Sequence, residues 1–261
     1  MHRWDAWITD ESAEKLRSRT HAQLLGQLRA DLYHGATPAA LAAIDMLLAC
    51  GWDPNTLLEE GLLHTLRTLD GDARDGILFA PEALRAIVSI ERAVKVLHPL
   101  IGRSAGEPFG TAVIGTVRGD THDIGKDIVA MMLARAGFTL VDLGTDTPCD
   151  VFLEALRAHP VDVLVLSTQL TAGIPHMKVL IERMCALRIR ERHLVLVGGT
   201  PLNEEFAKAV GADAYCRDAA TCAETARSLL AARRAGAAGG ARPRTPLQHD
   251  TAPAALATRA G

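Results

Sequence analysis

A short polar segment, residues 118–126, holds the side chains of this chain that are best suited to chemistry. It reads Arg-Gly-Asp-Thr-His-Asp-Ile-Gly-Lys and follows an apolar run that is typical of a buried strand. In an extended loop, residues i and i+2 point the same way, so the carboxylate of Asp120 can lie close to the imidazole of His122. The carboxylate can then accept a proton from one ring nitrogen while the other nitrogen faces the site. Metal-binding and general-base histidines are supported in this way.

The scarcity of other ligands restricts the metal that this histidine could bind. A zinc site made by protein alone needs three or four ligands, and no other His, Cys or carboxylate stands at an obvious ligand spacing. A metal that arrives inside a macrocycle, with most of its ligands already attached, needs only one ligand from the protein. A polar turn at a strand end that binds nothing stays open as the alternative at this point.

The elements that must position this loop follow from the hydrophobic pattern after about residue 110. Short apolar, β-branched runs alternate with helical stretches, which predicts a parallel sheet covered on both faces. Right-handed crossovers then favour an α/β fold with a doubly wound, flavodoxin-like five-stranded sheet. The expected strands are 111–117, 139–143, 161–166, 194–197 and a weak one near 212–216, and the expected helices are 124–136, 148–158, 174–189, 202–209 and 219–233.

Three other loops are expected at the same edge, because ligands of open parallel sheets bind beyond the carboxyl ends of the strands. These loops are 144–147, 167–173 and 198–201. Gly198 and Gly199 allow a ligand to approach the backbone, although many ordinary turns look alike. The chain lacks both G-x-x-x-x-G-K-[ST] and G-x-G-x-x-G, which argues against ATP and NAD. Ser167 lacks the G-x-S-x-G surroundings of a hydrolase nucleophile, so a hydrolase is disfavoured.

The region before the sheet reads as helices throughout. Apolar residues recur at helical spacing from residue 13 to 33 and in helices that begin near 37, 54 and 81, which predicts a small bundle. The last residues are rich in Ala, Gly and Pro without an apolar period, and we expect them to be disordered. The expected domains are a helical cap over 1–105, a Rossmann-like domain over 106–234 and a disordered tail over 235–261.

Composition narrows the partners and the compartment. The chain has 261 residues, a formal net charge of −3 and a pI near 6.4, which gives no support for a nucleic-acid or membrane partner. Its five cysteines form no C-x-x-C pair, so neither a disulfide framework nor a cysteine-ligated zinc is expected. Reduced thiols in the cytoplasm fit this usage better, and we expect a cytoplasmic protein.

The motifs at the sheet edge resemble a known family. The stretch Gly-Thr-Val-Arg-Gly-Asp-Thr-His-Asp-Ile-Gly-Lys resembles the cobalamin-binding signature of methionine synthase and of corrinoid methyl-carrier proteins, D-x-H-x-x-G followed by S-x-L and G-G. Between Gly125 and Ser167 lie 41 residues, and 28 lie between Gln169 and Gly198, as in that signature. A segment containing Phe79, Pro81 and Glu82 is similar to the F-x-P-E segment of the family's helical cap. The resemblance covers roughly residues 40–230.

This resemblance implies a role for each matching residue. His122 would be the lower axial ligand to the cobalt of cobalamin or methylcobalamin, displacing the nucleotide base into a slot beside the first helix. Asp120 would accept from the far nitrogen of His122, Thr171 would contact the tail or corrin edge, and Phe79 would cover the upper face. The full cofactor-binding set is Gly119, Asp120, Thr121, His122, Asp123, Ile124, Gly125, Ser167, Gln169, Thr171, Gly198, Gly199, Ala219 and Phe79. Gln169 replaces the usual Leu, and Gly173 stands where methionine synthase carries the hydroxyl of a His-Asp-Ser relay.

The resemblance implies a corrinoid protein that carries a methyl group on cobalt between partner methyltransferases. The chain is too short for an additional substrate barrel of about 250 residues, so a substrate-specific methyltransferase and an acceptor methyltransferase are expected as separate proteins, with a reductive activator as a further partner. A cobalamin-dependent sensor or regulator that acts through a protein partner is the main alternative. A detached mutase subunit is a third.

Overall fold

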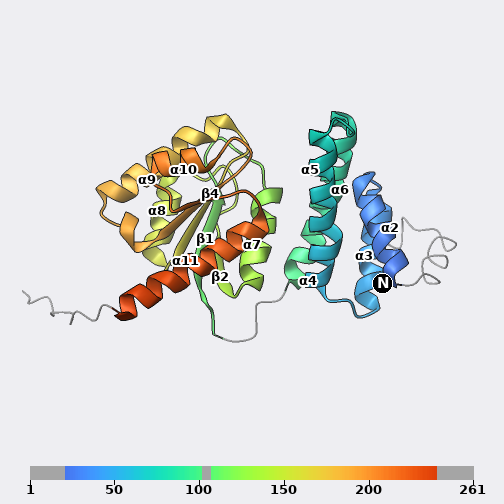
Figure 1. The fold of residues 1–261 in the computed structure, drawn as a ribbon, viewed down its shortest axis with the longest axis horizontal. Coiled ribbons are helices and arrows are strands. Elements are labelled where there is room, and N and C mark those ends of the chain that lie inside the picture. Colours follow the sequence, from blue (N-terminus) through green and yellow to red (C-terminus); the bar gives the residue numbers. More distant parts are fainter. Residues whose placement is uncertain (1–20, 102–106, 240–261) are drawn as a thin grey trace, which may run out of the picture.

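The structure, a computed structural model, describes residues 21–101 and 107–239. Figure 1 shows two lobes side by side, a helical lobe (residues 21–101) and a sheet lobe (residues 107–239). The boundary expected at 105/106, the helical pattern expected before residue 21 and the tail expected after residue 239 lie outside the described residues. The α/β fold with N-terminal helices and a five-stranded parallel sheet is confirmed.

The helical lobe is a helix bundle around a leucine-rich core. Each of its three longest helices buries an apolar stripe in this core, as helical periodicity predicts. The elements are α2 (His21–Tyr33), α3 (Thr37–Ala49), α4 (Pro54–Thr56), the π-helix η1 (Leu57–Leu63), α5 (His64–Arg74), α6 (Ala80–Leu97) and the 3₁₀ turn η2 (His98–Leu100).

The π-helix η1 interrupts what the sequence predicts as one continuous third helix. The buried residues Leu57 and Leu62 are five positions apart, as are Leu58 and Leu63, and the i→i+5 bonding of a π-helix places such pairs on one face. Gly61 lies within this segment, and a Cβ there would come within 3.1 Å of Leu28. The wider turn thus turns all four leucines into the core while the glycine lets α2 pack closely.

The sheet lobe has five parallel strands in the order β2-β1-β3-β4-β5. The order in which the chain adds strands to the sheet therefore reverses between β1 and β3. The loops after these two strands lie side by side, which is where ligands of open α/β sheets bind. In the register of the sheet, Thr116 at the end of β1 lies opposite Ser167 at the end of β3, and Ser167 lies opposite Gly198 at the end of β4. The strands are β1 (Gly110–Thr116), β2 (Phe138–Asp142), β3 (Val163–Ser167), β4 (Leu194–Gly198) and β5 (Ala214–Cys216).

Helices cover both faces of the sheet, because successive apolar residues of each strand point to opposite sides. One face packs on α7 (Ile124–Arg135) and α11 (Ala219–Gly239), and its apolar core continues into that of the helical lobe. The other face packs on α8 (Cys149–Ala158), α9 (Ile174–Ala186) and α10 (Glu204–Val210). Short 3₁₀ turns, η3 (Thr171–Gly173) and η4 (Arg190–Arg192), flank α9.

Helix α11 corrects one expectation. It continues to Gly239, so residues 235–239 are helical, whereas the composition predicts a disordered tail from residue 235. Alanine is the best helix former, and an alanine-rich segment can extend a helix that is already anchored by packing. In the described part of the chain, no helix is long and apolar enough to cross a membrane.

Candidate functional site

The loop between β1 and α7 holds Asp120 and His122 in a defined geometry. Gly119 makes the turn with a positive φ of 86°, and Asp123 is the N-cap residue of α7. Nδ1 of His122 lies 2.6 Å from Oδ1 of Asp120, and the backbone N–H of His122 donates to the same oxygen at 2.9 Å. The hydroxyl of Thr116 donates to the carbonyl oxygen of His122. Backbone and ring of His122 are therefore both held in place.

Asp120 is fully buried, and hydrogen bonds surround its carboxylate. Oδ2 accepts from the hydroxyl of Thr168 at 2.7 Å and from the backbone N–H groups of Gln169 at 2.5 Å and Leu170 at 3.2 Å. Burial by itself raises the pKa of Asp120, but the hydrogen bonds from His122, Thr168 and Gln169 outweigh it and hold this pKa well below its usual range. Asp120 therefore stays ionised and accepts a hydrogen bond from the Nδ1–H group of His122.

The other ring nitrogen of His122 is left available to a ligand. The side chain of His122 is 57% exposed even though its partner Asp120 is fully buried. In the neutral ring, the hydrogen bond to Asp120 places the proton on Nδ1 and leaves the lone pair on Nε2, which is the tautomer of imidazole that binds metals through Nε2. The arrangement can supply one oriented nitrogen ligand at the carboxyl edge of the sheet.

Thr168 is packed between two glycines that make room for it. A Cβ at Gly173 would overlap the hydroxyl of Thr168, and a Cβ at Gly199 would overlap its carbonyl oxygen. Gly199 also has a φ of 133°, which L-residues rarely adopt. Glycine at both positions lets the loops after β3 and β4 meet and turns the Thr168 hydroxyl toward Asp120.

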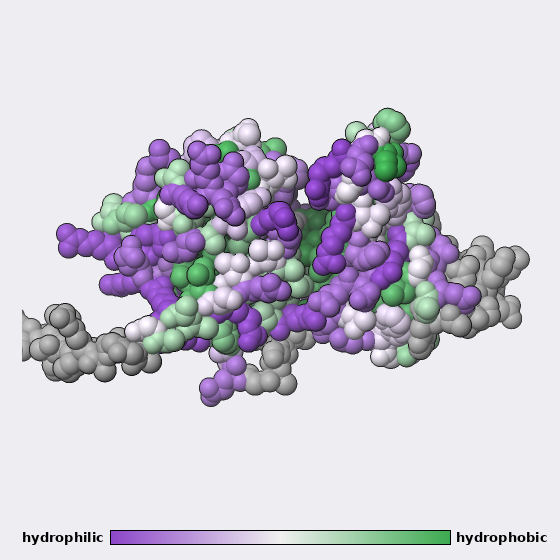
Figure 2. All heavy atoms as spheres, in the orientation of Figure 1, coloured by the Kyte–Doolittle hydropathy of each residue, from purple (hydrophilic) through white to green (hydrophobic). Residues whose placement is uncertain are grey.

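A cavity of about 430 Å³ lies beside this loop, between the two lobes. Figure 2 shows the corresponding hollow, with apolar residues at its floor. The helical lobe contributes residues of η1 and α5 to its wall, and the sheet lobe contributes the start of α7, the ends of β3, β4 and β5, and the start of α11. Its wall includes Leu66, Arg67, Gly125, Lys126, Ser167, Gln169, Gly198, Gly199, Thr200, Tyr215, Cys216, Arg217, Asp218, Ala219, Ala220 and Cys222.

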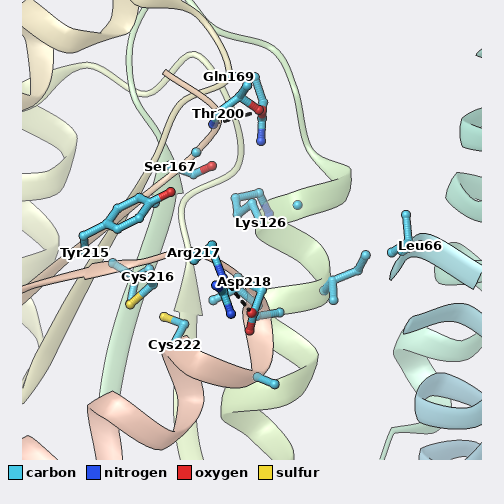
Figure 3. A pocket seen from close by; sticks show the side chains of 18 of the residues that line it. Leu66, Lys126, Ser167, Gln169, Thr200, Tyr215, Cys216, Arg217, Asp218 and Cys222 are labelled. Atoms are coloured by element: carbon cyan, nitrogen blue, oxygen red, sulfur yellow. Dashed lines mark hydrogen bonds and ion pairs between the residues drawn. The ribbon is translucent and has the colours of Figure 1, made fainter. Parts of the chain in front are cut away.

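Gln169 places an amide in the wall of this cavity. Its Oε1 accepts from the backbone N–H of Thr200 at 3.3 Å and from the Thr200 hydroxyl. Its Nε2 lies where it would be 3.4 Å from a Cβ at Gly125. Figure 3 shows the side chain next to Thr200 and above Ser167. The amide therefore bridges two loops and presents its N–H₂ group beside the first turn of α7.

Lys126 is a buried cation in the same wall, at 3% exposure. Its Nζ lies 2.6 Å from Asp127 and 2.5 Å from Asp142. Burial by itself lowers the pKa of Lys126, but its hydrogen bonds to Asp127 and Asp142 raise it above the usual value. Lys126 therefore stays protonated, and the carboxylates of Asp127 and Asp142 balance its charge. Its ion pair with Asp142 links α7 to the end of β2.

Comparisons with known proteins agree with this architecture. Residues 110–227 match the family model of the B12 binding domain. The chain is 34% identical over 185 residues to trimethylamine corrinoid protein 1 of Methanosarcina acetivorans, covering 70% of this chain and 86% of that protein. It is 33% identical over 210 residues to dimethylamine corrinoid protein 1 of the same organism, covering 80% of this chain and 98% of that protein.

The structure of the monomethylamine corrinoid protein of Methanosarcina barkeri is similar over its whole length. The TM-score is 0.68 at 25% identity, and the match covers 80% of this chain and 100% of that chain. The chain belongs to the corrinoid proteins. The expected relationship to corrinoid methyl-carrier proteins is confirmed, and cobalamin is the cofactor of this corrinoid protein.

The residues of this corrinoid protein fit cobalamin. The cobalt of a corrin already has the ring nitrogens as ligands, so a single nitrogen such as Nε2 of His122 would be enough to hold it from the protein. The wall of the cavity beside it includes small residues that would leave room for a nucleotide tail, namely Gly125, Ser167, Gly198, Gly199, Ala219 and Ala220. The donor set offers one ligand, and no group of three or more His, Cys, Asp or Glu residues within 21–101 and 107–239 could hold a bare metal ion.

The structure brings most of the expected site residues of the corrinoid protein to this edge. The loop after β1 holds Gly119, Asp120, Thr121, His122 and Asp123, and Ile124 begins α7. The cavity wall includes Gly125, Ser167, Gln169, Gly198, Gly199 and Ala219. Thr171 lies in η3 and is exposed, outside the cavity wall. Phe79 is the N-cap residue of α6, is 69% exposed and does not line the cavity. Their roles toward the corrin stay predictions.

Several residues of the site carry no signal in the sequence motifs. Thr168 bonds to Asp120 although the family pattern places its relay hydroxyl at position 173. Arg67 from α5 and Asp218 beside α11 reach the cavity from opposite lobes. Burial by itself raises the pKa of Asp218, but hydrogen bonds from Thr221 outweigh it and lower this pKa, with help from Arg217 and Arg67. Only the hydroxyl of Thr168, in the unmatched middle position of S-x-L, could have been suspected in advance.

Proposed function

We propose that this corrinoid protein carries a methyl group on the cobalt of cobalamin between a substrate-specific methyltransferase and an acceptor methyltransferase. The observation that carries the proposal is the exposed imidazole of His122, which buried Asp120 orients at 2.6 Å next to a cavity whose wall includes several small residues. In a corrinoid protein, one oriented imidazole nitrogen beside such a cavity is suited to hold the cobalt of the cofactor.

Each residue of the site has a separate task in this proposal. His122 supplies the lone pair of Nε2 to the metal, and Asp120 holds the proton on Nδ1, which keeps the ring in the metal-binding tautomer. Thr168 and the backbone N–H groups of the β3 loop keep the carboxylate of Asp120 ionised and in position. The bound cofactor supplies a cobalt centre that accepts and releases a methyl group.

The cavity and the helical lobe hold the rest of the cofactor. The small residues Gly125, Gly198 and Gly199 leave the space that a displaced nucleotide base requires. In the proposed resting form, the helical lobe would cover the bound cofactor and would use the apolar side chain of Phe79 to do so. Displacement of the helical lobe then gives partner enzymes access, as lids do in other enzymes.

Partner proteins provide the substrate chemistry. Relatives named for trimethylamine and dimethylamine make methylated amines the first methyl donors to test. A reductive activator that restores an oxidised cofactor is a further proposed partner. No feature of the described residues favours the sensor or the mutase alternative over the carrier.

The assignment of His122 is tested by absorption spectroscopy of the cofactor-free protein reconstituted with methylcobalamin. We expect the spectrum of cobalamin whose base is displaced and replaced by histidine. The His122→Ala variant should lose that spectrum and bind more weakly. His176 is a matched control, because this exposed histidine approaches within about 4 Å of a Cβ at Gly119, and His176→Ala should leave the spectrum unchanged.

Two outcomes contradict the proposal. If His122→Ala keeps the histidine-bound spectrum, or if His176→Ala loses it instead, the ligand assignment is wrong. If wild-type protein binds methylcobalamin but transfers no methyl group to or from any candidate methyltransferase, while a partner protein binds only the loaded form, the regulator alternative replaces the carrier.

A further inference from the structure

Two cysteines lie next to one another in the wall of the cavity. Cys216 ends β5, and Cys222 lies in the first turn of α11. Both line the cavity, and Figure 3 shows their sulfur atoms pointing toward one another. Each of the two thiols shifts the pKa of the other. Cys216 is 6% exposed and Cys222 is fully buried, so the cavity is the side from which a reagent reaches them.

The remaining cysteines are separate from this pair. Cys50 and Cys185 are exposed, Cys149 is half-buried against Arg183, and none of the three lines the cavity. Two thiols are too few for a structural zinc, which takes four ligands, and the described residues offer no third ligand beside them. The chemistry that two adjacent thiols retain is exchange between dithiol and disulfide.

The two neighbouring thiols are unequal. The interaction with Cys222 lowers the pKa of Cys216, while the interaction with Cys216, together with burial, raises the pKa of Cys222. Cys216 thus reaches the thiolate form more readily, and it is the one with residual exposure. A nucleophilic cysteine beside a second thiol that can resolve its oxidised form is the arrangement of redox-responsive pairs.

We propose that Cys216 and Cys222 are a redox pair that closes to an intramolecular disulfide when the cavity is empty and is protected when the cofactor fills it. This rests on the proposed function in one respect, namely that the cofactor occupies this cavity. The disulfide joins the end of β5 to α11 across Arg217, Asp218, Ala219 and Ala220, all of which line the cavity. Oxidation therefore fixes the wall against which the cofactor is held.

The reaction balances with hydrogen peroxide as the oxidant. The thiolate of Cys216 attacks one peroxide oxygen, the O–O bond breaks, and the leaving hydroxide takes up the proton that the thiol had released, which gives water and a sulfenic acid on Cys216. The thiol of Cys222 then attacks that sulfur, the S–O bond breaks, and a second water leaves. Two thiols are oxidised, one peroxide is reduced to two waters, and a dithiol such as reduced thioredoxin reverses the change.

The experiment uses the full chain with Cys50, Cys149 and Cys185 changed to serine, so that the pair holds the only thiols. Cofactor-free protein is treated with hydrogen peroxide, and its intact mass and peptide map are followed in time. We expect a loss of two hydrogen atoms and a peptide linked through Cys216 and Cys222. With Cys222→Ser added, oxidation should stop at a sulfenic acid on Cys216 that dimedone traps, whereas Cys216→Ser should react far more slowly.

The second arm repeats the treatment after reconstitution with hydroxocobalamin. With free cofactor at ten times its dissociation constant, disulfide formation should slow by about tenfold, because only unoccupied protein reacts. An equal rate with and without cofactor overturns the coupling. The proposal of a redox pair is overturned if the cofactor-free protein forms no Cys216–Cys222 disulfide under conditions in which the peroxide does oxidise Cys50 and Cys185 of the wild-type protein. A missing cobalamin spectrum would instead reject the proposed function, and the first arm would still decide the pair.

Discussion

The hydroxyl of Thr168 fills the space that a side chain at Gly173 would need. In methionine synthase, the position of Gly173 carries the hydroxyl of the His-Asp-Ser relay that the family resemblance implies. Here the hydroxyl comes from Thr168 and lies 2.7 Å from Oδ2 of Asp120. Thr168 therefore supplies the hydroxyl in place of residue 173, and the carboxylate of Asp120 keeps a hydroxyl partner.

Removal of that hydroxyl should loosen the support of His122. Thr168→Val keeps the shape but loses the hydrogen bond to a buried carboxylate, which should cost about 1–3 kcal/mol of unfolding free energy. Cobalamin affinity should fall by about 10–100-fold, as it does when outer partners of a metal ligand are removed. Urea unfolding and cofactor titration measure both. Thr168→Ser is the matched control and should stay near wild type in both, and equal losses in the two variants would show that the hydroxyl is not responsible.

The exchange between positions 168 and 173 predicts coupling between two substitutions. Gly173→Ser alone should destabilise the protein, because its Cβ overlaps Thr168. In the background of Thr168→Ala, the same change should cost less, since the obstructing hydroxyl is gone, although the Cβ of residue 168 stays 2.8 Å away. Unfolding free energies of the four proteins give the coupling. Strictly additive effects would contradict the shared space.

The close contact of the β3 and β4 loops predicts the effect of a side chain at Gly199. Gly199→Ala should destabilise the protein strongly, because its Cβ overlaps the carbonyl oxygen of Thr168 and its φ of 133° is strained for alanine. Gly144→Ala is the control, since Gly144 also has a positive φ, 77°, but nothing lies near its Cβ. Thermal melts should show a clearly larger loss for Gly199→Ala, and equal losses would mean that only backbone strain matters.

His193 predicts a loss of stability in acid that is independent of the cofactor. Burial lowers the pKa of His193, with help from Arg190, Arg192 and Arg233, and its Nδ1 bonds the carbonyl oxygen of Val161 at 2.8 Å. In the unfolded chain, this histidine takes up a proton near pH 6.5, whereas in the folded protein it does so only at lower pH. The contribution of His193 to the unfolding free energy is therefore fully present above about pH 6.5, and it is lost as the pH falls from there toward the lowered pKa.

The measurement compares His193→Asn with wild type. The unfolding free energy should decline less steeply from about pH 8 to about pH 5 in His193→Asn. The difference in slope should correspond to at most one proton taken up on unfolding. His159→Asn changes an exposed histidine of the same lobe and should keep the wild-type slope. An unchanged slope in His193→Asn would show that another group is responsible.

The local order of this protein was predictable from its sequence, because it depends on short-range periodicity. Apolar runs alternating with helical stretches predict five parallel strands, and all five are found within three residues of their expected bounds at either end. The contact between Asp120 and His122 was predictable for the same reason, since two residues two apart in a loop face one way. The π-helix over Leu57–Leu63 was not predicted, because its apolar residues also fit an ordinary helix.

Contacts between distant segments were decided only by the tertiary structure. Thr168 reaches Asp120 because Gly173 and Gly199 allow two strand-end loops to meet, and no spacing in one segment contains that information. Cys216 and Cys222 match no cysteine motif, yet the turn from β5 into α11 brings their side chains together at the cavity. The sequence by itself determined which residues stand at the carboxyl edge of the sheet. The packing of one loop on the next decided which of them touch, because a side chain's neighbours across a sheet edge depend on backbone turns that the sequence specifies only through the whole fold.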